Sequence, residues 1–156
     1  MLTLEIPKFK DLEVDTIVFD LNGTIACDGH LITGVRAEIN KLAEDFKIYV
    51  LTADTFGTAE NLLADLNAEL EVIDSDSGSE YKYNFVKKLG SSRVIAVGNG
   101  NNDAKMLKEA EVGIAVIGPE GAAFSALQNA DLTAKDIIDV LDIISKPRRL
   151  KASLRK

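Results

Sequence analysis

Four polar sites in this sequence contain residue types that bind phosphate and divalent cations, and three of them follow short apolar runs. The first is residues 20–24 (DLNGT), and the second is Thr52 with Ala53. The third is Lys82, which opens a segment of helical period, and the fourth is residues 98–103 (GNGNND). A carboxylate that follows a buried strand contributes nothing to stability unless something ligates it. These sites are therefore the first candidates for chemistry.

The chemistry that these residue types favour is phosphoryl transfer to a carboxylate. Asp20 as a nucleophile would form an aspartyl-phosphate, which is one established route of covalent catalysis. Gly23 permits a tight turn whose N–H groups face an anion. Thr52 offers a hydroxyl to a phosphoryl oxygen, and the charge of Lys82 offsets the negative nucleophile and substrate. Asp20 and Asp103 provide the oxygen ligands that Mg²⁺ prefers.

The elements that must position these residues alternate between strands and helices. The apolar runs predict strands at 15–20, 46–51, 69–73, 93–97 and 112–117, with shorter ones near 131–133 and 2–6. Helical periodicity predicts helices near 33–45, 56–67, 79–89, 101–110, 119–128 and 135–145. This alternation predicts an α/β fold in which a doubly wound parallel sheet lies between two helical layers. Ligands bind beyond the carboxyl ends of such strands, where the four polar sites lie.

The four sites, in this order, resemble the motifs of the haloacid dehalogenase (HAD) superfamily. The helix that begins at Lys82 and the run 98–107 (GNGNNDAKML) resemble the phosphorylation domain of P-type ATPases and small soluble P-type ATPase-like proteins. The resemblance spans Asp20 to Asp103, and the strand at 112–117 extends it. It implies a Rossmann-like sheet whose first strand is central, between the second and the fourth.

The resemblance also implies a role for each matching residue. Asp20 is the expected nucleophile, and the expected Mg²⁺ site consists of Asp20, the backbone carbonyl of Asn22, Asn99 and Asp103. Phosphate is expected to contact Gly23, Thr52, Ala53, Lys82 and Asn102. Asn102 is also expected to orient the metal site.

Two asparagines depart from the pattern of the family. Asn22 stands where phosphatases of the family have the aspartate that protonates the leaving group and later activates water. A carboxamide cannot exchange protons at neutral pH, and general acid–base catalysis contributes roughly 10²–10⁴-fold, so slow turnover is expected. Asn99 stands where the family usually has a metal-associated aspartate. Phosphate binding is therefore expected to survive better than catalysis.

The spacing of the motifs leaves no room for a cap domain. Only 31 residues separate Asp20 from Thr52, and 29 separate Thr52 from Lys82. A predicted helix fills the first gap, and a helix and a strand fill the second. The expected site is open and acts on a small phosphorylated substrate, and a homo-oligomer is one arrangement that would give it walls.

Charge and composition limit the other partners. The last eleven residues contain six Lys or Arg, while the remaining 12 basic and 25 acidic residues leave a net charge of −13. Nucleic-acid binding by the main domain is therefore not expected. No apolar run approaches the ~18 residues of a membrane helix, and the single Cys27 suits a reducing cytoplasm. We expect one catalytic domain over residues 1–146 and a basic tail over 147–156 that is a solvated, frayed helix end.

Some assignments have alternatives. Thr52 would instead be an ordinary helix cap unless Asp54 or Thr55 fills that role. Lys82 competes with two nearby lysines of the same segment, Lys87 and Lys88.

Two functions from different classes are consistent with these residues. The first is a slow Mg²⁺-dependent phosphatase, and the second is a phosphate-binding or regulatory protein with little turnover, for which Asn22 and Asn99 argue. A two-component receiver domain would place its phosphoacceptor after the third strand, near residues 73–76, but it has no place for the 98–103 motif. Dehalogenase activity fits poorly, because Lys82 and the region of Asp103 suit a phosphate and a metal.

Overall fold

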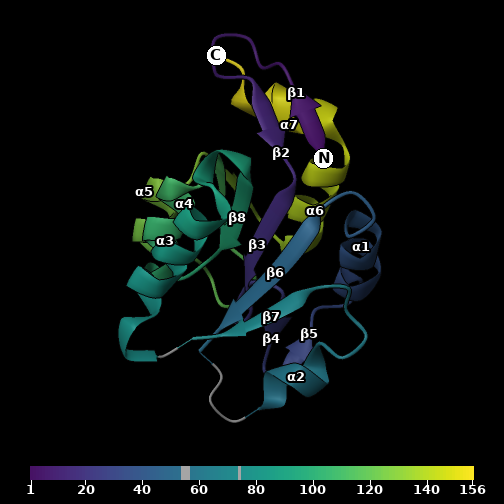
Figure 1. Ribbon diagram of the computed structural model, residues 1–156, viewed down its shortest axis with the longest axis vertical. Helices are drawn as coiled ribbons and strands as arrows, with labels where there is room; N and C mark the ends of the chain where they lie inside the picture. Colours follow the sequence, from purple (N-terminus) through teal and green to yellow (C-terminus); the bar gives the residue numbers. More distant parts are fainter. Residues whose placement is uncertain (54–56, 74) are drawn as a thin grey trace.

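Six parallel strands form the central sheet, in the order β10-β9-β8-β3-β6-β7 (Figure 1). The strands are β3 (Thr16–Asp20), β6 (Lys47–Thr52), β7 (Glu69–Val72), β8 (Val94–Gly98), β9 (Val112–Val116) and β10 (Leu132–Ala134). Every residue of β3, β8 and β9 is buried, as near-continuous apolar strands require in a sheet covered on both faces. The structure is a computed structural model that describes residues 1–53, 57–73 and 75–156.

Helices cover both faces of this sheet. They are α1 (Val35–Leu42), α2 (Thr58–Leu62), α3 (Gly78–Leu89), α4 (Ala104–Glu109), α5 (Phe124–Asn129), α6 (Ile137–Ser145) and α7 (Pro147–Leu154). Helices α3, α4 and α5 lie together on one side, and α1 and α6 lie on the other (Figure 1). Two separate apolar clusters accordingly fill the space on the two sides of the sheet. The predicted three-layer α/β fold is confirmed.

The register of the central strands brings the predicted polar sites to one edge. Asp20 at the end of β3 pairs with Leu51 of β6, so Thr52 lies one residue beyond it on the neighbouring strand. On the other side Phe19 pairs with Val97. Strand β3 is therefore flanked by the second and fourth strands of the predicted sheet, as the resemblance implied.

Two small sheets were not predicted. The N-terminal strand β1 (Leu2–Leu4) does not join the main sheet but pairs antiparallel with β2 (Leu12–Val14). A short hairpin of β4 (Ala26–Cys27) and β5 (His30–Leu31) follows the Asp20 site. The strand expected near 2–6 is present as β1, but β2, β4 and β5 were not expected, because strands of two or three residues seldom show a periodicity. The sequence did contain one signal of the hairpin, the dipeptide Asp28-Gly29. Both residues have positive φ, as a type I′ turn requires.

The helix expected at 119–128 begins only at Phe124. Residues 118–121 (GPEG) form a turn instead, in which Gly118 and Gly121 have φ of 49° and 73°. The N–H of Gly121 donates to the carbonyl of Gly118 at 3.2 Å. This turn, which we name the 118–121 turn, lies at the carboxyl end of β9 and therefore at the same edge as Asp20.

The expectation of a solvated, frayed C-terminus was wrong, because residues 147–154 form helix α7. Leu150 and Leu154 are buried, and α7 packs against α6 and β1. Arg149 is anchored by Asp142 at 3.0 Å. The high charge of the segment concealed the apolar pair at i and i+4, which gives the helix a buried face.

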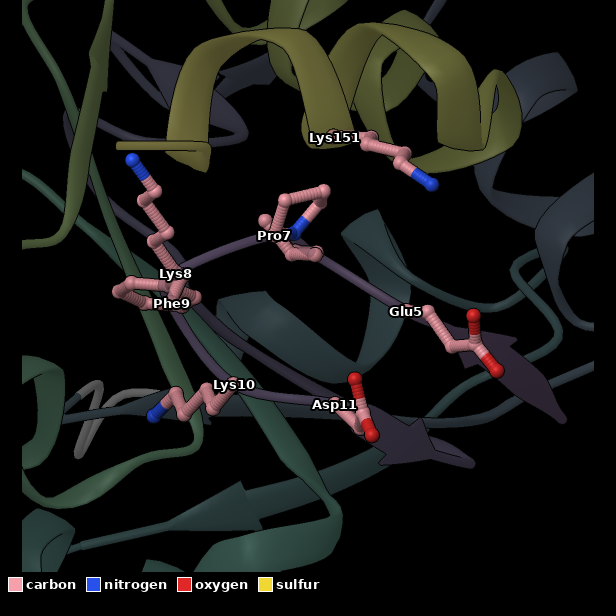
Figure 2. A pocket seen from close by; sticks show the side chains of 8 residues that line it. Glu5, Pro7, Lys8, Phe9, Lys10, Asp11 and Lys151 are labelled. Carbon is pink, nitrogen blue, oxygen red and sulfur yellow. The ribbon is translucent and has the colours of Figure 1, made fainter.

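Helix α7 and the N-terminal loop form the end of the molecule that lies opposite the carboxyl ends of β3 and β6 (Figure 1). A pocket of about 430 Å³ opens between them, and the side chain of Lys151 projects from α7 above the loop (Figure 2). The pocket is lined by Lys151 and by Glu5, Ile6, Pro7, Lys8, Phe9, Lys10 and Asp11. In the described part of the chain, no helix is long and apolar enough to cross a membrane.

Truncation of Leu150 tests the packing of α7. Leu150 is fully buried, so Leu150→Ala is expected to lower the free energy of unfolding by about 2–5 kcal/mol. The exposed Ser153→Ala on the same helix is the control and should leave stability nearly unchanged. Urea unfolding followed by circular dichroism measures both. Equal stability of the two variants would show that α7 is not part of the cooperative fold.

Candidate active site

Asp20 is the buried end of the central strand. It directly follows four buried residues of β3, and the Asp20 side chain is 11% exposed. Its Oδ1 accepts a hydrogen bond from Lys82 Nζ at 2.6 Å, and its Oδ2 accepts one from Thr24 Oγ1 at 3.0 Å. Both oxygens of the carboxylate are therefore held in a fixed orientation.

Lys82 reaches this carboxylate from helix α3. Lys82, Phe85 and Val86 lie on one face of the helix at i, i+3 and i+4, and all three are buried. The Lys82 side chain is only 1% exposed. Lys87 and Lys88 are exposed, so the geometry selects Lys82 from the three candidate lysines.

Asp103 holds Lys82 from the opposite side. Its Oδ1 accepts from Lys82 Nζ at 2.7 Å. Its Oδ2 accepts from the backbone N–H groups of Asn99 at 3.0 Å and Gly100 at 2.8 Å. Gly98 leaves room for this arrangement, since a Cβ there would lie 2.5 Å from Asp103 Cγ. Asp103 thus closes the 98–103 loop and fixes the ammonium group.

Asn99, in the 98–103 loop, connects the 20–24 loop to the 118–121 turn. Its Oδ1 lies 3.2 Å from Thr24 Oγ1, which also contacts Asp20. Its Nδ2 donates to the carbonyl of Gly121 at 3.0 Å. Its backbone carbonyl accepts from the N–H of Ala123 at 2.8 Å. The 118–121 turn is therefore attached to the site through Asn99.

Gly23 lies where the 20–24 loop, Asn99 and the 118–121 turn meet, and no larger residue fits there without moving them. It has φ of 82°, a conformation that glycine adopts at little cost. A Cβ on residue 23 would lie 2.5 Å from Glu120 Oε2 and 2.6 Å from Asn99 Nδ2. Glu120 thus lies against the loop that follows Asp20, and it was not predicted from the sequence. A turn rich in Gly and Pro that follows a buried strand was the signal that would have identified it.

The other predicted residues lie around this centre. Thr52 is buried at the end of β6, and α2 begins after Gly57, so Thr52 is not the cap of that helix. Ala53 and Asn22 are exposed. Asp54, Thr55 and Asp74, which entered the alternatives above, lie outside the described residues.

Asn102 is not brought against Asp20. Its Oδ1 lies 2.7 Å from the position that a Cβ on Gly100 would take, and its Nδ2 lies 3.9 Å from that of Gly78. Asn102 therefore lies between the 98–103 loop and the start of α3, and its side chain is exposed.

The buried charges do not balance. Burial and the neighbouring Asp103 raise the pKa of Asp20 to about 7, although Lys82 acts in the opposite direction. Burial alone would lower the pKa of Lys82, but the two carboxylates more than offset this and raise it. Two carboxylates therefore share one ammonium group, and a cation beside Asp20 would relieve the excess negative charge.

The donor atoms suit a hard cation. Within the described ranges, no group of three His, Cys, Asp or Glu side chains is arranged to hold a metal ion. Both oxygens of Asp103 are already engaged. Asp20 and the amide oxygen of Asn99 also accept hydrogen bonds, so the donors at the centre are the oxygens of Asp20, Asp103 and Asn99. These are oxygen ligands, which suit Mg²⁺, and their low total charge indicates weak binding.

Comparisons with known proteins concern the family and the fold of the chain. A family model described as haloacid dehalogenase-like hydrolase matches residues 81–139. An uncharacterized protein of Methanocaldococcus jannaschii is 46% identical over 69 residues, which are 44% of this chain and 74% of the relative. A soluble P-type ATPase-like phosphatase of the same organism is 25% identical over 138 residues, which are 86% of this chain. The chain spans half the length of that phosphatase.

The same fold occurs in solved structures. A 3-deoxy-D-manno-octulosonate 8-phosphate phosphatase from Moraxella catarrhalis, in complex with a magnesium ion, a phosphate ion and KDO, aligns with a TM-score of 0.65. The alignment covers 85% of this chain and 86% of that one at 19% identity. This likeness concerns the fold.

Proposed function

The chain belongs to the haloacid dehalogenase-like hydrolases, and from this premise we propose that it is a phosphatase whose nucleophile is Asp20. One observation supports the proposal above all others. The buried Lys82 binds Asp20 and is itself locked by Asp103. A carboxylate and an ammonium group, both fixed before a substrate arrives, form a preorganised site for a negatively charged phosphoryl group.

The proposed reaction has two steps. In the first, an oxygen of Asp20 bonds to the phosphorus of a phosphomonoester, the bond to the leaving oxygen breaks, and that oxygen takes up a proton from solvent, since Asn22 cannot supply one. In the second, water attacks the phosphorus of the aspartyl-phosphate, which releases inorganic phosphate and regenerates the carboxylate. Lys82 and the hydroxyl of Thr52 would neutralise and hold the phosphoryl oxygens. The N–H groups of the turn at Gly23, together with Ala53 and Asn102, would complete the phosphate site.

We also propose that the site takes Mg²⁺. Asp20, the backbone carbonyl of Asn22 and the amide oxygen of Asn99 would hold the ion. When bound, it would supply positive charge that offsets the negative charge of the phosphoryl group. Asp103 would contribute an oxygen to the ion as well as position Lys82: each of its oxygens accepts a hydrogen bond, as both oxygens of Asp20 do, and a carboxylate oxygen has a second lone pair.

A phosphate-binding or regulatory protein with little turnover is the second candidate. The observation that favours it is that the exposed residue at position 22 is Asn22, which cannot exchange protons at neutral pH. A leaving group that receives no proton departs slowly unless it is already a stable anion. The two candidates therefore differ in rate rather than in the location of the site.

The substrate class follows from the open surroundings of Asp20. Between Asp20 and Thr52, the hairpin of β4 and β5 is the only element besides α1 and β6, and its strands have two residues each. We propose a small phosphorylated compound as the substrate, and a second copy of the chain as one way to complete the walls. The Moraxella catarrhalis neighbour is named for a phosphorylated sugar acid, which is consistent with this size class.

The first test is hydrolysis of p-nitrophenyl phosphate with Mg²⁺. Wild-type turnover should fall on the order of 10³-fold or more in Asp20→Asn, because the nucleophile is lost. The exposed Asp45→Asn makes the same chemical change away from the site and should retain full activity. Acid-quenched protein should carry an acid-stable, hydroxylamine-labile phosphate only when Asp20 is present. A folded wild type that neither turns over nor forms this adduct would contradict the proposed phosphatase.

A further inference from the structure

The leaving group of the proposed reaction meets no proton donor at position 22. Asn22 is exposed and begins the tight turn in which the N–H of Gly23 donates to the carbonyl of Ala26 at 2.7 Å. Its side chain is an amide, which cannot exchange protons at neutral pH. A substrate whose leaving oxygen must be protonated is therefore a poor match for this site.

Lys82 and Asp103 do not replace the missing acid. Asp103 acts only as an acceptor, toward Lys82 Nζ and two backbone N–H groups. Lys82 donates to Asp20 at 2.6 Å and to Asp103 at 2.7 Å. If Lys82 gave up its proton, two carboxylates would lose their common counter-charge, which is costly for buried groups. Both residues are thus engaged in holding the site together.

A carboxylate leaving group removes the need for a proton. When the bond between phosphorus and the leaving oxygen breaks, the electron pair stays on that oxygen. An alkoxide is a strong base and has to be protonated, whereas a carboxylate is stable as an anion, since the pKa of a carboxylic acid is about 4. Asp20 is itself a carboxylate, so the phosphoryl group would pass from one carboxylate to another without any proton transfer.

The positive charge at the site fits a single phosphoryl group. Over residues 1–53, 57–73 and 75–156, Lys82 is the one basic side chain that contacts Asp20 or Asp103. The chain without its last eleven residues has a net charge of 12 − 25 = −13, which disfavours the approach of strongly anionic ligands. Pyrophosphate and nucleotides, in which a second phosphate leaves, carry more negative charge than an acyl phosphate does. An acyl phosphate is therefore the better match.

We infer that the substrate of this site is an acyl phosphate, the mixed anhydride of a carboxylic acid and phosphoric acid. The inference rests on the proposed function, because it names the substrate class of the same site. In the first step, an oxygen of Asp20 bonds to phosphorus, the bond from phosphorus to the acyl oxygen breaks, and its electron pair leaves with the carboxylate product. In the second step, the oxygen of water bonds to phosphorus, Asp20 leaves as a carboxylate, and the protons of the water go to phosphate and solvent.

Asn22 affects these two steps differently. The first step needs no proton from position 22. The second is slow, because an amide cannot deprotonate the attacking water. Phosphorylated protein should therefore accumulate with an acyl phosphate, so that an intact site and a low turnover are compatible.

A rapid-quench reaction with radiolabelled acetyl phosphate and Mg²⁺ tests the first step. Wild type should form about one acid-stable, hydroxylamine-labile phosphate per chain before the steady state, whereas Asp20→Asn should form none. The exposed Asp45→Asn is the control and should be labelled as wild type is. Radiolabelled pyrophosphate and ethyl phosphate are used in parallel, and neither should label the protein at a comparable rate.

Asn22→Asp separates the effect of the missing acid from the intrinsic reactivity of each substrate. The kcat/KM for ethyl phosphate should rise about 10²–10⁴-fold, whereas that for acetyl phosphate should change by less than about 3-fold, because only the ethyl compound leaves as a strong base. Less phosphorylated protein should accumulate in this variant, since a carboxylate at position 22 deprotonates the attacking water. The exposed Asn67→Asp should leave both values unchanged.

The outcomes separate this inference from the proposed function. Ethyl phosphate hydrolysed as fast as acetyl phosphate, labelling by pyrophosphate alone, or an equal gain for both substrates in Asn22→Asp would overturn the acyl phosphate and leave the phosphatase intact. Labelling by acetyl phosphate that persists in Asp20→Asn would contradict the proposed nucleophile and with it the inference. A wild type that is neither labelled by acetyl phosphate nor active on p-nitrophenyl phosphate would contradict both.

Discussion

Lys82→Met is expected to abolish phosphatase turnover and to destabilise the fold at neutral pH. Lys82 is the only basic side chain that contacts Asp20 or Asp103 among the described residues, and its side chain is 1% exposed. Methionine has a similar length, so the packing of α3 on the sheet is kept while the charge is removed. Loss of one partner from a buried ion pair costs about 3–5 kcal/mol, because the other charge stays buried and uncompensated.

The pH dependence identifies the cause of this loss. Without the ammonium group, the pKa of Asp20 should rise further, so the folded variant holds a proton that the unfolded chain releases. A folded state that binds more protons than the unfolded state loses stability as pH rises. The stability gap to wild type should therefore be larger at pH 8 than at pH 5, as measured by urea unfolding at both values. The exposed Lys88→Met on the same helix is the control. A gap that does not depend on pH would attribute the loss to packing alone.

Asn22→Asp is expected to raise turnover by about 10²–10⁴-fold, the usual contribution of general acid–base catalysis. The substitution is nearly isosteric and residue 22 is exposed, so the fold should not change. The gain should be larger for alkyl phosphates, whose leaving oxygen needs a proton, than for p-nitrophenyl phosphate. Steady-state kinetics on both substrates measures this difference.

The exposed Asn67→Asp is the matched control for that gain. If Asn22→Asp awakens an inert wild type, the chain is an intact scaffold that serves for binding. If turnover stays constant on both substrates, the missing acid is not what limits the reaction, and the account of Asn22 is wrong.

The sequence predicted the central sheet and the residues at its edge because each left a strong local signal. Strands such as residues 94–98 are continuous apolar runs, and buried parallel strands have few other compositions. Asp20 and Lys82 were found because their types and order indicate phosphoryl transfer, and the structure places them 2.6 Å apart. Their roles in catalysis and in metal binding remain proposals.

The features that were not predicted from the sequence depend on contacts between residues that are far apart in the chain. Nothing local to Asp103 shows that Lys82 and two backbone N–H groups will occupy both of its oxygens. Glu120 lies 100 residues after Asp20, and the 118–121 turn places its carboxylate against Gly23. Helix α7 was missed because two buried leucines were outweighed by the surrounding charge.

The enclosure of Lys82 has a consequence for chemical labelling. Every other lysine of the chain is half-buried or exposed, so amine-reactive acylating reagents will modify those positions first. Lys82 can react only when Asp20 and Asp103 release it and the 98–103 loop opens. Its acylation rate, followed by peptide mass spectrometry, would therefore report how often the site opens. A ligand that closes the site should slow this single reaction and leave the others unchanged.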